Sequence, residues 1–587
     1  MADISIKING LTVTAPEGST ILEAARLAHI EIPTLCYLKG INEIGACRIC
    51  VVEVKGARTL VASCVYPISE GMEIYTNTKR VTESRKKTLE LLLSNHDRSC
   101  LSCERNGECE LQKLCKDLGV EDDRLYEGER SHYEIDDSAA HMYRDNNKCI
   151  LCRRCSAVCA NVQGIGVIGA NERGFHTNIS CAFDMDLADT ACVSCGQCIL
   201  ACPTGALVER DDTKEVLNAL HDPGKHVIVQ TAPAVRAGLG EAFGLPPGTD
   251  VTGKMVAALR MLGFAKVFDT DFAADVTIME EATEFLDRFM NGGTLPIITS
   301  CSPGWIKYCE HYFPELIPNL SSCKSPQQMF GAIAKTYYAK KAGIPPESIK
   351  MVSVMPCTAK KFEIGRKDED AAGEGIPDVD ISITVRELAR LIKQAGIDFN
   401  SLPDEEFDEP LGLSTGAAVI FGTTGGVMEA ALRTAVYKLT GENKDSPIDF
   451  KEVRGYDGIK EATYEIAGKT ISIAVASGLG NAKTLLKRVE SGEAHYDFIE
   501  IMGCPGGCVN GGGQIRVPAS VRNFTNIAAL RGAVLYHADS EKQVRRSHEN
   551  PAVLTLYRDF LGEPGSALAH HILHTSYVPR TVNPVFR

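Results

Sequence analysis

Cysteine is the residue type that offers the most chemistry in this sequence. The chain has 23 cysteines among 587 residues, and seventeen of them precede residue 203, mostly in C-x-x-C or similar spacings. Thiolates at such spacings bind iron–sulfur clusters or zinc. Disulfides are the alternative, but 23 is an odd number and C-x-x-C spacing is typical of metal sites. The sequence therefore predicts several metal centres in its first third.

The first four cysteines follow a short hairpin and a helix. Residues 4–8 and 11–14 alternate apolar and polar side chains around Asn9-Gly10, a dipeptide typical of tight hairpins. A helix over residues 21–26 follows. This order resembles the start of a plant-type ferredoxin and implies a β-grasp [2Fe–2S] domain over residues 1–78. Its ligands would be Cys36, Cys47, Cys50 and Cys64, with the Cys47-x-x-Cys50 pair on one iron; structural zinc is the alternative.

A histidine and three cysteines form the next group. After a helical run over residues 81–93 the sequence reads His96-x3-Cys100-x2-Cys103-x5-Cys109. One imidazole and three thiolates can bind a [4Fe–4S] cluster, and the neutral ligand would tune its potential. Its position resembles the large iron–sulfur subunit of respiratory complex I, which implies a [4Fe–4S] domain over residues 79–118. A histidine that merely lies near the cysteines is the alternative.

Two further runs of four cysteines carry the most specific spacing in the chain. Each run reads C-x2-C-x2-C-x3-C, and the second ends in Cys-Pro. The double pattern resembles the two-cluster bacterial ferredoxin, in which the fourth cysteine of each run binds the other cluster. The resemblance implies a two-[4Fe–4S] domain over residues 138–210, with one cluster on Cys149, Cys152, Cys155 and Cys202. It places the other cluster on Cys192, Cys195, Cys198 and Cys159.

The composition changes after residue 224, where strand-like and helix-like runs alternate to about residue 510. This alternation predicts an α/β catalytic domain. Three of its loops combine cysteine with glycine, proline or lysine: residues 299–305 (TSCSPGW), 355–363 (MPCTAKKFE) and 500–508 (EIMGCPGGC). A series of accessory clusters leading to a separate cysteine site is typical of a redox enzyme.

These loops resemble the signatures of the iron-only, or [FeFe], hydrogenases, and the resemblance extends over essentially the whole chain. It implies an H-cluster, in which a [4Fe–4S] cubane is bridged by cysteine to a di-iron unit with CO, cyanide and azadithiolate ligands. Cys357 and Cys504 would bind the cubane, and Cys508 would bridge. Lys360 would donate a hydrogen bond to a cyanide. The residues that would wall the di-iron pocket are Pro233, Pro326, Gln327, Met355, Phe421 and Met502.

The first loop departs from the family pattern. Most members have two adjacent cysteines, the first relaying protons and the second binding the cubane, whereas this chain has Cys301 and then Ser302. Three alternatives stay open: Ser302 binds as an alkoxide, a harder donor than thiolate; the loop shifts so that Cys301 binds; or the cubane is labile and the cluster absent. The intact second and third loops favour a bound H-cluster.

Three further positions concern how the chain fits the cluster. Ala234 lies where relatives place serine, so hydrogen bonding to the cluster is expected to be weaker there. Gly506 and Gly507 would let the backbone pack closely against the cluster.

Carboxylates complete a proton path by the same resemblance, which runs from Cys301 through Glu281 and Ser321 to Glu284. The two carboxylates are three residues apart on a helix expected over residues 277–289, so they share a face. A buried carboxylate with a raised pKa moves protons near neutral pH. The alternative is a solvated acidic helix face, because other acidic residues lie in the same run.

The expected fold is multidomain, α+β in the accessory part and α/β in the H-cluster domain, residues 224–522. Residues 523–587 resemble the segment that is a separate small subunit in some relatives. His570, His571 and His574 in this tail could bind a metal, but their alternation with leucine and alanine favours packing around the catalytic domain.

Composition limits the partners and the location. A net charge of −14 argues against nucleic acid, which needs a basic patch. No apolar stretch reaches the ~18–20 residues of a membrane span, and no signal-peptide pattern opens the sequence, so a cytoplasmic protein is expected. No Rossmann glycine fingerprint and no flavin site is found, which leaves flavin and NAD(P)H to other subunits.

The resemblance implies reversible H2 oxidation and proton reduction, with electrons carried by four accessory clusters. The domain order most resembles the catalytic subunits of multimeric NAD(P)-linked, electron-bifurcating hydrogenases. It implies three partners: a flavin- and NAD(P)-binding subunit, a small [2Fe–2S] subunit of complex-I-like type, and ferredoxin. The alternative is an electron conduit or H2 sensor whose turnover Ser302 impairs. The loops with Cys357, Cys504 and Cys508 disfavour a molybdopterin subunit.

Overall fold

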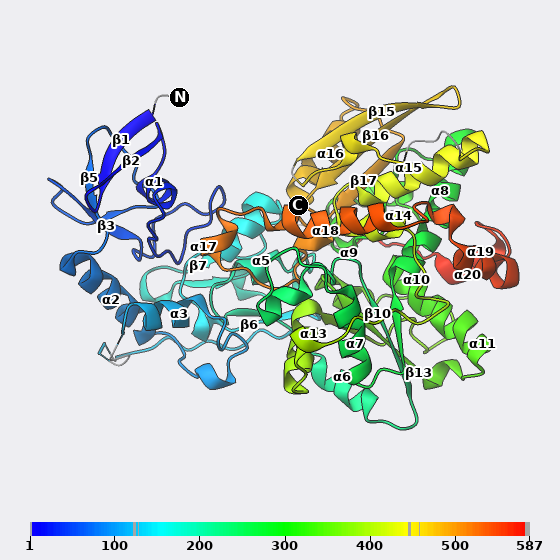
Figure 1. Cartoon of the computed structure of the whole chain (residues 1–587), viewed down its shortest axis with the longest axis horizontal. Helices are drawn as coiled ribbons and strands as arrows, with labels where there is room; N and C mark the ends of the chain where they lie inside the picture. The colour runs from blue at the N-terminus through cyan, green and yellow to red at the C-terminus, as the bar shows by residue number, and fades with distance from the viewer. Residues whose placement is uncertain (1–2, 121–124, 127, 444–447, 457, 581–587) are drawn as a thin grey trace.

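The computed structural model describes residues 3–120, 125–126, 128–443, 448–456 and 458–580. The ends of the first and last expected domains, residues 1–2 and 581–587, lie outside these ranges. Figure 1 shows the N-terminal domain at one end of the long axis and the catalytic half at the other, with the segment near residues 100–210 between them. The multidomain fold class expected from the sequence is confirmed.

The first domain is a small mixed sheet covered by one helix. The Asn9-Gly10 turn has φ values of 50° and 87°, as a tight hairpin turn requires, and Thr20 caps the helix in a reciprocal pair of hydrogen bonds with Glu23. The strand order is β2-β1-β5-β3-β4. The elements are β1 (Asp3–Ile8), β2 (Leu11–Pro16), α1 (Ile21–Leu27), β3 (Val51–Val54), β4 (Val61–Ala62) and β5 (Glu73–Tyr75).

The middle of the chain repeats one backbone pattern around its cysteines. Leu151 and Ser194 have φ values of 54° and 62°, and Arg153 and Gly196 have φ values of 60° and 67°. These left-handed residues turn the backbone around each C-x-x-C segment before a short helix begins. The elements here are α2 (Lys79–Ser94), α3 (Glu110–Asp117), β6 (Met142–Arg144), α4 (Arg154–Ala157), β7 (Gly169–Asn171), β8 (Asn178–Ser180), α5 (Gln197–Ala201) and β9 (Leu207–Glu209).

The catalytic domain is built on two sheets whose strands are mostly parallel. Their orders are β11-β10-β13-β14 and β12-β17-β16-β15, and only the β15–β16 pair is antiparallel among the pairs described. The first sheet comprises β10 (His226–Thr231), β11 (Lys266–Asp269), β13 (Ile349–Met355) and β14 (Ile381–Thr384). The second comprises β12 (Ile297–Ile298), β15 (Ile459–Ile466), β16 (Lys469–Ser477) and β17 (Phe498–Met502). Their apolar runs predict strands covered on both faces.

Helices cover both faces of each sheet. The helices of this domain are α6 (Thr213–Leu220), α7 (Thr252–Met261), α8 (Asp271–Asn291), α9 (Pro303–Tyr312), α10 (Pro326–Ile333), α11 (Ala339–Ala342), α12 (Ala359–Glu363), α13 (Val385–Gln394), α14 (Gly416–Val419), α15 (Gly426–Thr440) and α16 (Leu479–Glu490). Helix α17 (Ala519–Arg522) packs instead against the accessory domains. Helices α7 and α13 pack on one face of the first sheet, and α8 and α10 on the other. Helix α8 also packs with α15 on the second sheet, so it lies between the two sheets.

The tail wraps the catalytic domain with three helices, α18 (Ile527–Glu541), α19 (Pro551–Leu556) and α20 (Ala567–Leu573). Ile572 and Leu573 are buried against residues of α8 and α10, whereas His570 and His571 face solvent. The packing role expected for this segment agrees with this arrangement. Among the helices of the described ranges, none has both the length and the apolar character of a membrane span.

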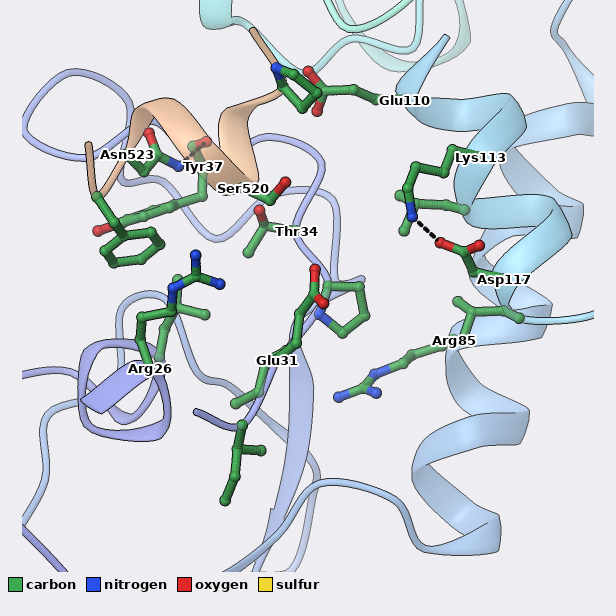
Figure 2. A pocket seen from close by; sticks show the side chains of 18 residues that line it. Arg26, Glu31, Thr34, Tyr37, Arg85, Glu110, Lys113, Asp117, Ser520 and Asn523 are labelled. Atoms are coloured by element: carbon green, nitrogen blue, oxygen red, sulfur yellow. Dashed lines mark hydrogen bonds and ion pairs between the residues drawn. The ribbon is translucent and has the colours of Figure 1, made fainter. Parts of the chain in front are cut away.

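The segment that leaves the catalytic domain closes against the first domain. Asn523 accepts a hydrogen bond from the Lys39 backbone at 3.2 Å, and the Arg26 guanidinium lies 4.8 Å from the centre of the Phe524 ring. Together with α1, α2 and α3 this segment encloses a cavity lined by charged side chains such as Lys113 (Figure 2). No cysteine is among its described lining residues, so it is not a cluster site.

Candidate active site and its electron path

Four strands of the two catalytic sheets end at one cavity. Pro233 follows β10, Cys301 follows β12, Cys357 follows β13 and Cys504 follows β17. In parallel sheets, the loops at the carboxyl ends of the strands are where ligands bind, and here the ends of two sheets meet. The lining residues are Ala232, Pro233, Thr270, Ala274, Cys301, Ser302, Pro303, Pro326, Gln327, Met355, Pro356, Cys357, Lys360, Phe421, Met502, Gly503, Cys504, Gly507, Cys508 and Gly511.

The three cysteines of the second and third loops are half-buried and all line this cavity. Burial, and to a smaller extent the neighbouring Cys357, raise the pKa of the Cys508 thiol to about 12. Glycine allows the two loops to approach, because a Cβ on Gly511 would collide with the carbonyl oxygen of Pro356. A set of thiols in a dry cavity is the donor set that an iron–sulfur cubane requires, so the residues fit the cofactor.

Gly507 has a φ of 93°, and a Cβ there would lie 2.7 Å from the backbone nitrogen of Thr424. It lines the cavity beside Cys508, whereas Gly506 does not line it. Ala234 is buried just behind the cavity wall, and its carbonyl accepts a hydrogen bond from Gln514 Nε2 at 2.7 Å. The methyl side chain of Ala234 offers no hydrogen bond of its own.

Lys360 reaches the cavity from α12, where it is held by a carboxylate. Its Nζ donates to Glu363 Oε2 at 2.8 Å and to the carbonyl of Cys301 at 3.4 Å. An ammonium has three donors, so one remains to point into the cavity. The same Glu363 oxygen accepts hydrogen bonds from Ser325 Oγ and Gln327 Nε2, both at 2.9 Å. Glu363 therefore fixes two of the expected pocket residues, Lys360 and Gln327.

Sequence reasoning assigned no role to Glu363. The available signal was its spacing, because a carboxylate three residues after a lysine on a helix lies on the same face.

Ser302 is at the start of α9, on the cavity wall beside the cysteines. Its Oγ accepts a hydrogen bond from the Gly503 backbone at 3.2 Å, next to Cys504. Cys301 also lines the cavity, and the nearby carboxylate of Glu281 contributes to a raised pKa of its thiol. Ser302 thus contacts the loop that carries Cys504, whereas Cys301 lies near Glu281 and also near Cys508.

Helix α8 is longer than the sequence predicts, and the alternative of a solvated acidic face is wrong for it. Glu281 is 1% exposed because α8 lies between the sheets. Burial and the charge of Glu284 raise the pKa of Glu281, a hydrogen bond with Ser321 lowers it, and the net result is a pKa of about 8. Ser321 Oγ also donates to Glu284 Oε2 at 3.0 Å, and Arg288 pairs with Glu284 at 2.5 Å near the surface. The expected residues thus form a connected row.

The eight cysteines of the two-cluster domain gather in two sets. Cys159 lines one cavity together with Cys192, Cys195 and Cys198. Burial, together with the nearby thiols of Cys202 and Cys149, raises the pKa of the Cys152 thiol to about 12. The structure therefore brings the fourth cysteine of each run to the other run, as the spacing predicts, because the two short helices pack side by side.

In the first domain the four predicted ligands make two close sulfur contacts. Cys50 Sγ lies 3.3 Å from Cys64 Sγ, and the Cys36 thiol is hydrogen-bonded to Cys47. The closest sulfur contacts therefore join Cys50 to Cys64 and Cys36 to Cys47, and the sharing of one iron by Cys47 and Cys50 stays a prediction. Between Cys47 and Cys50 the backbone is left-handed at Arg48, with a φ of 57°.

The histidine group offers a free nitrogen to a metal. His96 is 7% exposed, and its Nδ1 has no hydrogen-bond partner among the described residues. Burial lowers the pKa of His96 to about 4, so the ring is neutral. A buried neutral imidazole with an unused nitrogen fits a ligand role. Cys109 of this group contacts the two-cluster domain, where its Sγ lies 3.7 Å from the Pro203 carbonyl.

The cysteine group of the first domain and the His96 group both contact the set of cysteines that contains Cys152 and Cys202. Asn42 Nδ2 donates to the carbonyls of Cys36 and Cys152, at 2.8 and 3.0 Å. The Glu110 backbone donates to the Pro203 carbonyl at 3.0 Å, which is one residue from Cys202. The two accessory branches therefore join at the set that contains Cys152 and Cys202.

The second set in turn touches the catalytic loops. Thr358 Oγ1 donates to the Ser194 carbonyl at 2.8 Å, and Gln197 Nε2 donates to the Asn510 carbonyl at 2.9 Å. Cys195 is close enough to Cys504 to raise the pKa of its thiol, which burial already raises. These contacts were not foreseen from the sequence, because Thr358 and Gln197 carry no signal apart from standing beside cysteines.

Comparison with known proteins decides the family. The descriptions "Iron only hydrogenase large subunit, C-terminal domain" and "Iron hydrogenase small subunit" match residues 225–512 and 525–580. The NADP-reducing hydrogenase subunit HndD of Solidesulfovibrio fructosivorans is 54% identical over 591 residues, which cover 99% of this chain and 100% of that protein. The chain belongs to the iron-only hydrogenases. The resemblance that its loops suggest is thereby confirmed.

Two other similarities agree with this assignment. Iron hydrogenase 1 of Clostridium pasteurianum is 44% identical over 576 residues, which cover 98% of this hydrogenase and 99% of that protein. A solved structure of a variant of apo [FeFe]-hydrogenase HydA1 from Chlamydomonas reinhardtii shares 44% identity with a TM-score of 0.55. The match covers 63% of this hydrogenase and 99% of that chain, so the remainder carries the accessory domains.

The accessory part matches three further families. A 2Fe-2S iron-sulfur cluster binding domain matches residues 1–79, the NADH-ubiquinone oxidoreductase-G iron-sulfur binding region matches residues 85–124, and a 4Fe-4S dicluster domain matches residues 148–206. The protein is thus an [FeFe] hydrogenase, an oxidoreductase that carries an H-cluster, one [2Fe–2S] cluster and three accessory [4Fe–4S] clusters.

Proposed function

We propose that this hydrogenase interconverts H2 with protons and electrons as the catalytic subunit of a cytoplasmic NAD(P)-linked complex. The observation that carries the proposal is the single cavity in which Cys357, Cys504, Cys508 and Lys360 meet, with a row of proton-carrying side chains on one side. The full-length similarity to a subunit named as NADP-reducing supports the link to NAD(P).

The proposed partners follow from the part of the chain that lies far from the cavity. Electrons would leave through the set of Cys159, Cys192, Cys195 and Cys198 and then the set of Cys149, Cys152, Cys155 and Cys202. From there they would reach Cys36, Cys47, Cys50 and Cys64, or the group of His96, Cys100, Cys103 and Cys109. A flavin- and NAD(P)-binding subunit and a small [2Fe–2S] subunit would dock at this end (Figure 1). Ferredoxin would be a second electron partner, which is what electron bifurcation requires.

Each side chain around the cavity has a proposed task. The bound H-cluster supplies the metal centre at which the H–H bond is made or broken. Cys357 and Cys504 would hold the cubane and Cys508 the bridge, while Lys360 donates a hydrogen bond to an anionic ligand. The apolar wall of Met355, Met502, Pro233, Pro326 and Phe421, with Gln327, excludes water from the site.

Protons would move through the chain's own groups. The Cys301 thiol would exchange a proton with the cofactor amine and with Glu281, whose pKa of about 8 keeps it protonated at neutral pH. Ser321 then links Glu281 to Glu284, and Glu284 meets solvent beside Arg288. A carboxylate with a pKa near the working pH transfers protons in both directions efficiently.

We propose that Ser302 is the fourth cubane ligand and binds as an alkoxide. Its Oγ lies on the cavity wall, held by the Gly503 N–H beside Cys504. A hydrogen bond to this oxygen favours its charged form. The alternative function, an electron conduit or H2 sensor with impaired turnover, rests on the same residue, because an alkoxide is a harder donor for iron than a thiolate.

The test is the infrared spectrum of anaerobically purified protein co-expressed with maturases, with H2 uptake on the same sample. CO and cyanide bands together with turnover are the expected result. Bands without turnover would favour the sensor or conduit. Absence of the bands alongside intact accessory-cluster EPR signals would contradict the proposal. Adding the purified flavin-containing partner with NADP+ or NAD+ then tests the nucleotide link.

A further inference from the structure

The outermost carboxylate of the proton row is tied to the C-terminal tail. Ser322 donates to Glu284 with both its backbone N–H, at 3.1 Å, and its Oγ, at 3.2 Å. The same Oγ lies 2.8 Å from His574 Nδ1. The tail is held in place there, because the Lys324 N–H donates to the Leu573 carbonyl and the Thr575 N–H donates to the Ser322 carbonyl, both at 2.8 Å.

The other nitrogen of His574 faces a second carboxylate. His574 Nε2 lies 3.1 Å from Glu280 Oε2, and Glu280 is 1% exposed. Tyr557 donates to the other oxygen, Glu280 Oε1, at 2.5 Å, and the Gly565 N–H donates to Oε2 at 2.8 Å. The buried carboxyl group of Glu280 therefore occupies Nε2 of His574, while Nδ1 faces Ser322.

The direction of these hydrogen bonds depends on the charge of His574. Ser322 has one hydroxyl proton. When both nitrogens of His574 are protonated, Nδ1 donates to Ser322 Oγ, and the hydroxyl proton points to Glu284. When Nδ1 is bare, it accepts the hydroxyl proton, and Glu284 loses one donor. A carboxylate with fewer donors holds its proton more tightly.

We propose that His574 is a positioning residue which, when doubly protonated, directs the Ser322 hydroxyl to Glu284 and thereby sets the proton affinity of the outer end of the proton path. The inference rests on the proposed path through Glu284. It gives the tail a task in catalysis, in addition to covering the domain. His574 itself passes no proton onward, because both of its nitrogens are occupied and its side chain is only 6% exposed.

Several other titratable or charged groups lie around His574, Glu280 and Glu284. Helix α8 contributes Glu280, Glu284 and Arg288, and the Cys323 thiol lies 3.8 Å from Glu284 Oε2. From α20 the His570 ring lies 4.0 Å from the His574 ring, centre to centre. Lys438 of α15 interacts electrostatically with Glu280. Apart from Glu284 itself, none of these groups changes in the variants below.

The experiment is the pH profile of H2 evolution by the holoenzyme with reduced methyl viologen. E284Q first identifies the limb of the profile that belongs to Glu284. S322A and H574Q are then expected to move this limb to higher pH by about one unit, the effect of one lost hydrogen bond to a charged group. The double variant is expected to move it no further than S322A alone, because both act through one hydroxyl. H571A, at an exposed neighbour, is the control.

Infrared CO and cyanide bands identical to the wild type verify that each variant retains its cofactor. If H574Q leaves the limb in place, or adds its shift to that of S322A, the inference is wrong while the path stands. If E284Q itself behaves as the wild type, the proposed path fails and the inference with it. If H574Q loses its cofactor, S322A still tests the hydrogen bond from Ser322 to Glu284.

Discussion

At the scale of the residue, one carboxylate decides how protons reach the cavity. Glu281 lies on a helix that looks acidic and exposed in the sequence, yet it is 1% exposed. Burial and the charge of Glu284 raise its pKa to about 8, so that it holds a proton at neutral pH and releases it in alkali. The folded position of the side chain, and not its type, gives it this property.

Replacing Glu281 by glutamine keeps the size and polarity of the side chain but removes its titratable proton. We expect H2 evolution to fall by about 100-fold or more, as for loss of a general acid, with infrared bands unchanged. In the wild type, evolution should decline as the pH rises through about 8, because Glu281 then loses its proton. D287N, at an exposed position of the same helix, should retain full activity. Full activity of E281Q would contradict the path.

Ser302 gives a second prediction at this scale. If its oxygen binds the cubane, S302C supplies a softer donor and should keep the H-cluster while changing the EPR signal of the cubane. S302A removes the donor and should lower H-cluster occupancy, measured by the infrared bands. An S302A protein with unchanged bands and EPR signal would show that Ser302 is not a ligand.

At the scale of elements, the site exists because the strands of two sheets end together. The accessory cysteine set that contains Cys195 lies nearest to this site. Its backbone packs so closely against a catalytic loop that no side chain would fit between them. A Cβ on Gly512 would lie 2.7 Å from the Cα of Gly196 and collide with the Cys195 carbonyl. The contact brings a cluster-binding loop against the cubane loop, so close approach here serves electron transfer.

Gly512→Ala should therefore separate these two loops. The overpacking is expected to cost about 1–3 kcal/mol of stability, seen as a lower midpoint of thermal unfolding, and to slow H2 oxidation with viologen. Gly169→Ala is the matched control in the two-cluster domain, because a Cβ there meets nothing within 4 Å. Equal midpoints and rates for the two variants would show that the contact is not tight.

At the scale of the whole molecule, two accessory branches lead to one catalytic domain. The branch through the first domain starts at the end of the molecule opposite the catalytic half (Figure 1), and Asn42 connects it to Cys152. The second branch, with His96, joins at Cys202. Electrons from viologen can therefore enter without passing through the first domain, whereas electrons from a partner docked on that domain must pass through it.

Cys64→Ser should accordingly remove or alter the [2Fe–2S] EPR signal and leave viologen-linked H2 oxidation near the wild-type rate. NAD(P)+ reduction by the assembled complex should fall to background. Cys115→Ser, at a half-buried cysteine outside the ligand pattern, is the control for loss of a thiol. Undiminished NAD(P)+ reduction by the Cys64 variant would place the docking site on the other branch.

The sequence by itself determined the family, the fold class and the cysteine sets, because cluster ligands, turn residues and strand patterns are encoded by spacing within short segments. Only the tertiary structure decided which sulfurs contact each other in the first domain, where Cys50 meets Cys64 and Cys36 meets Cys47. It also decided the burial of Glu281, the joining of two branches and the contact of His574 with Ser322. These depend on segments up to hundreds of residues apart, whose packing fixes distances and desolvation that no local spacing specifies.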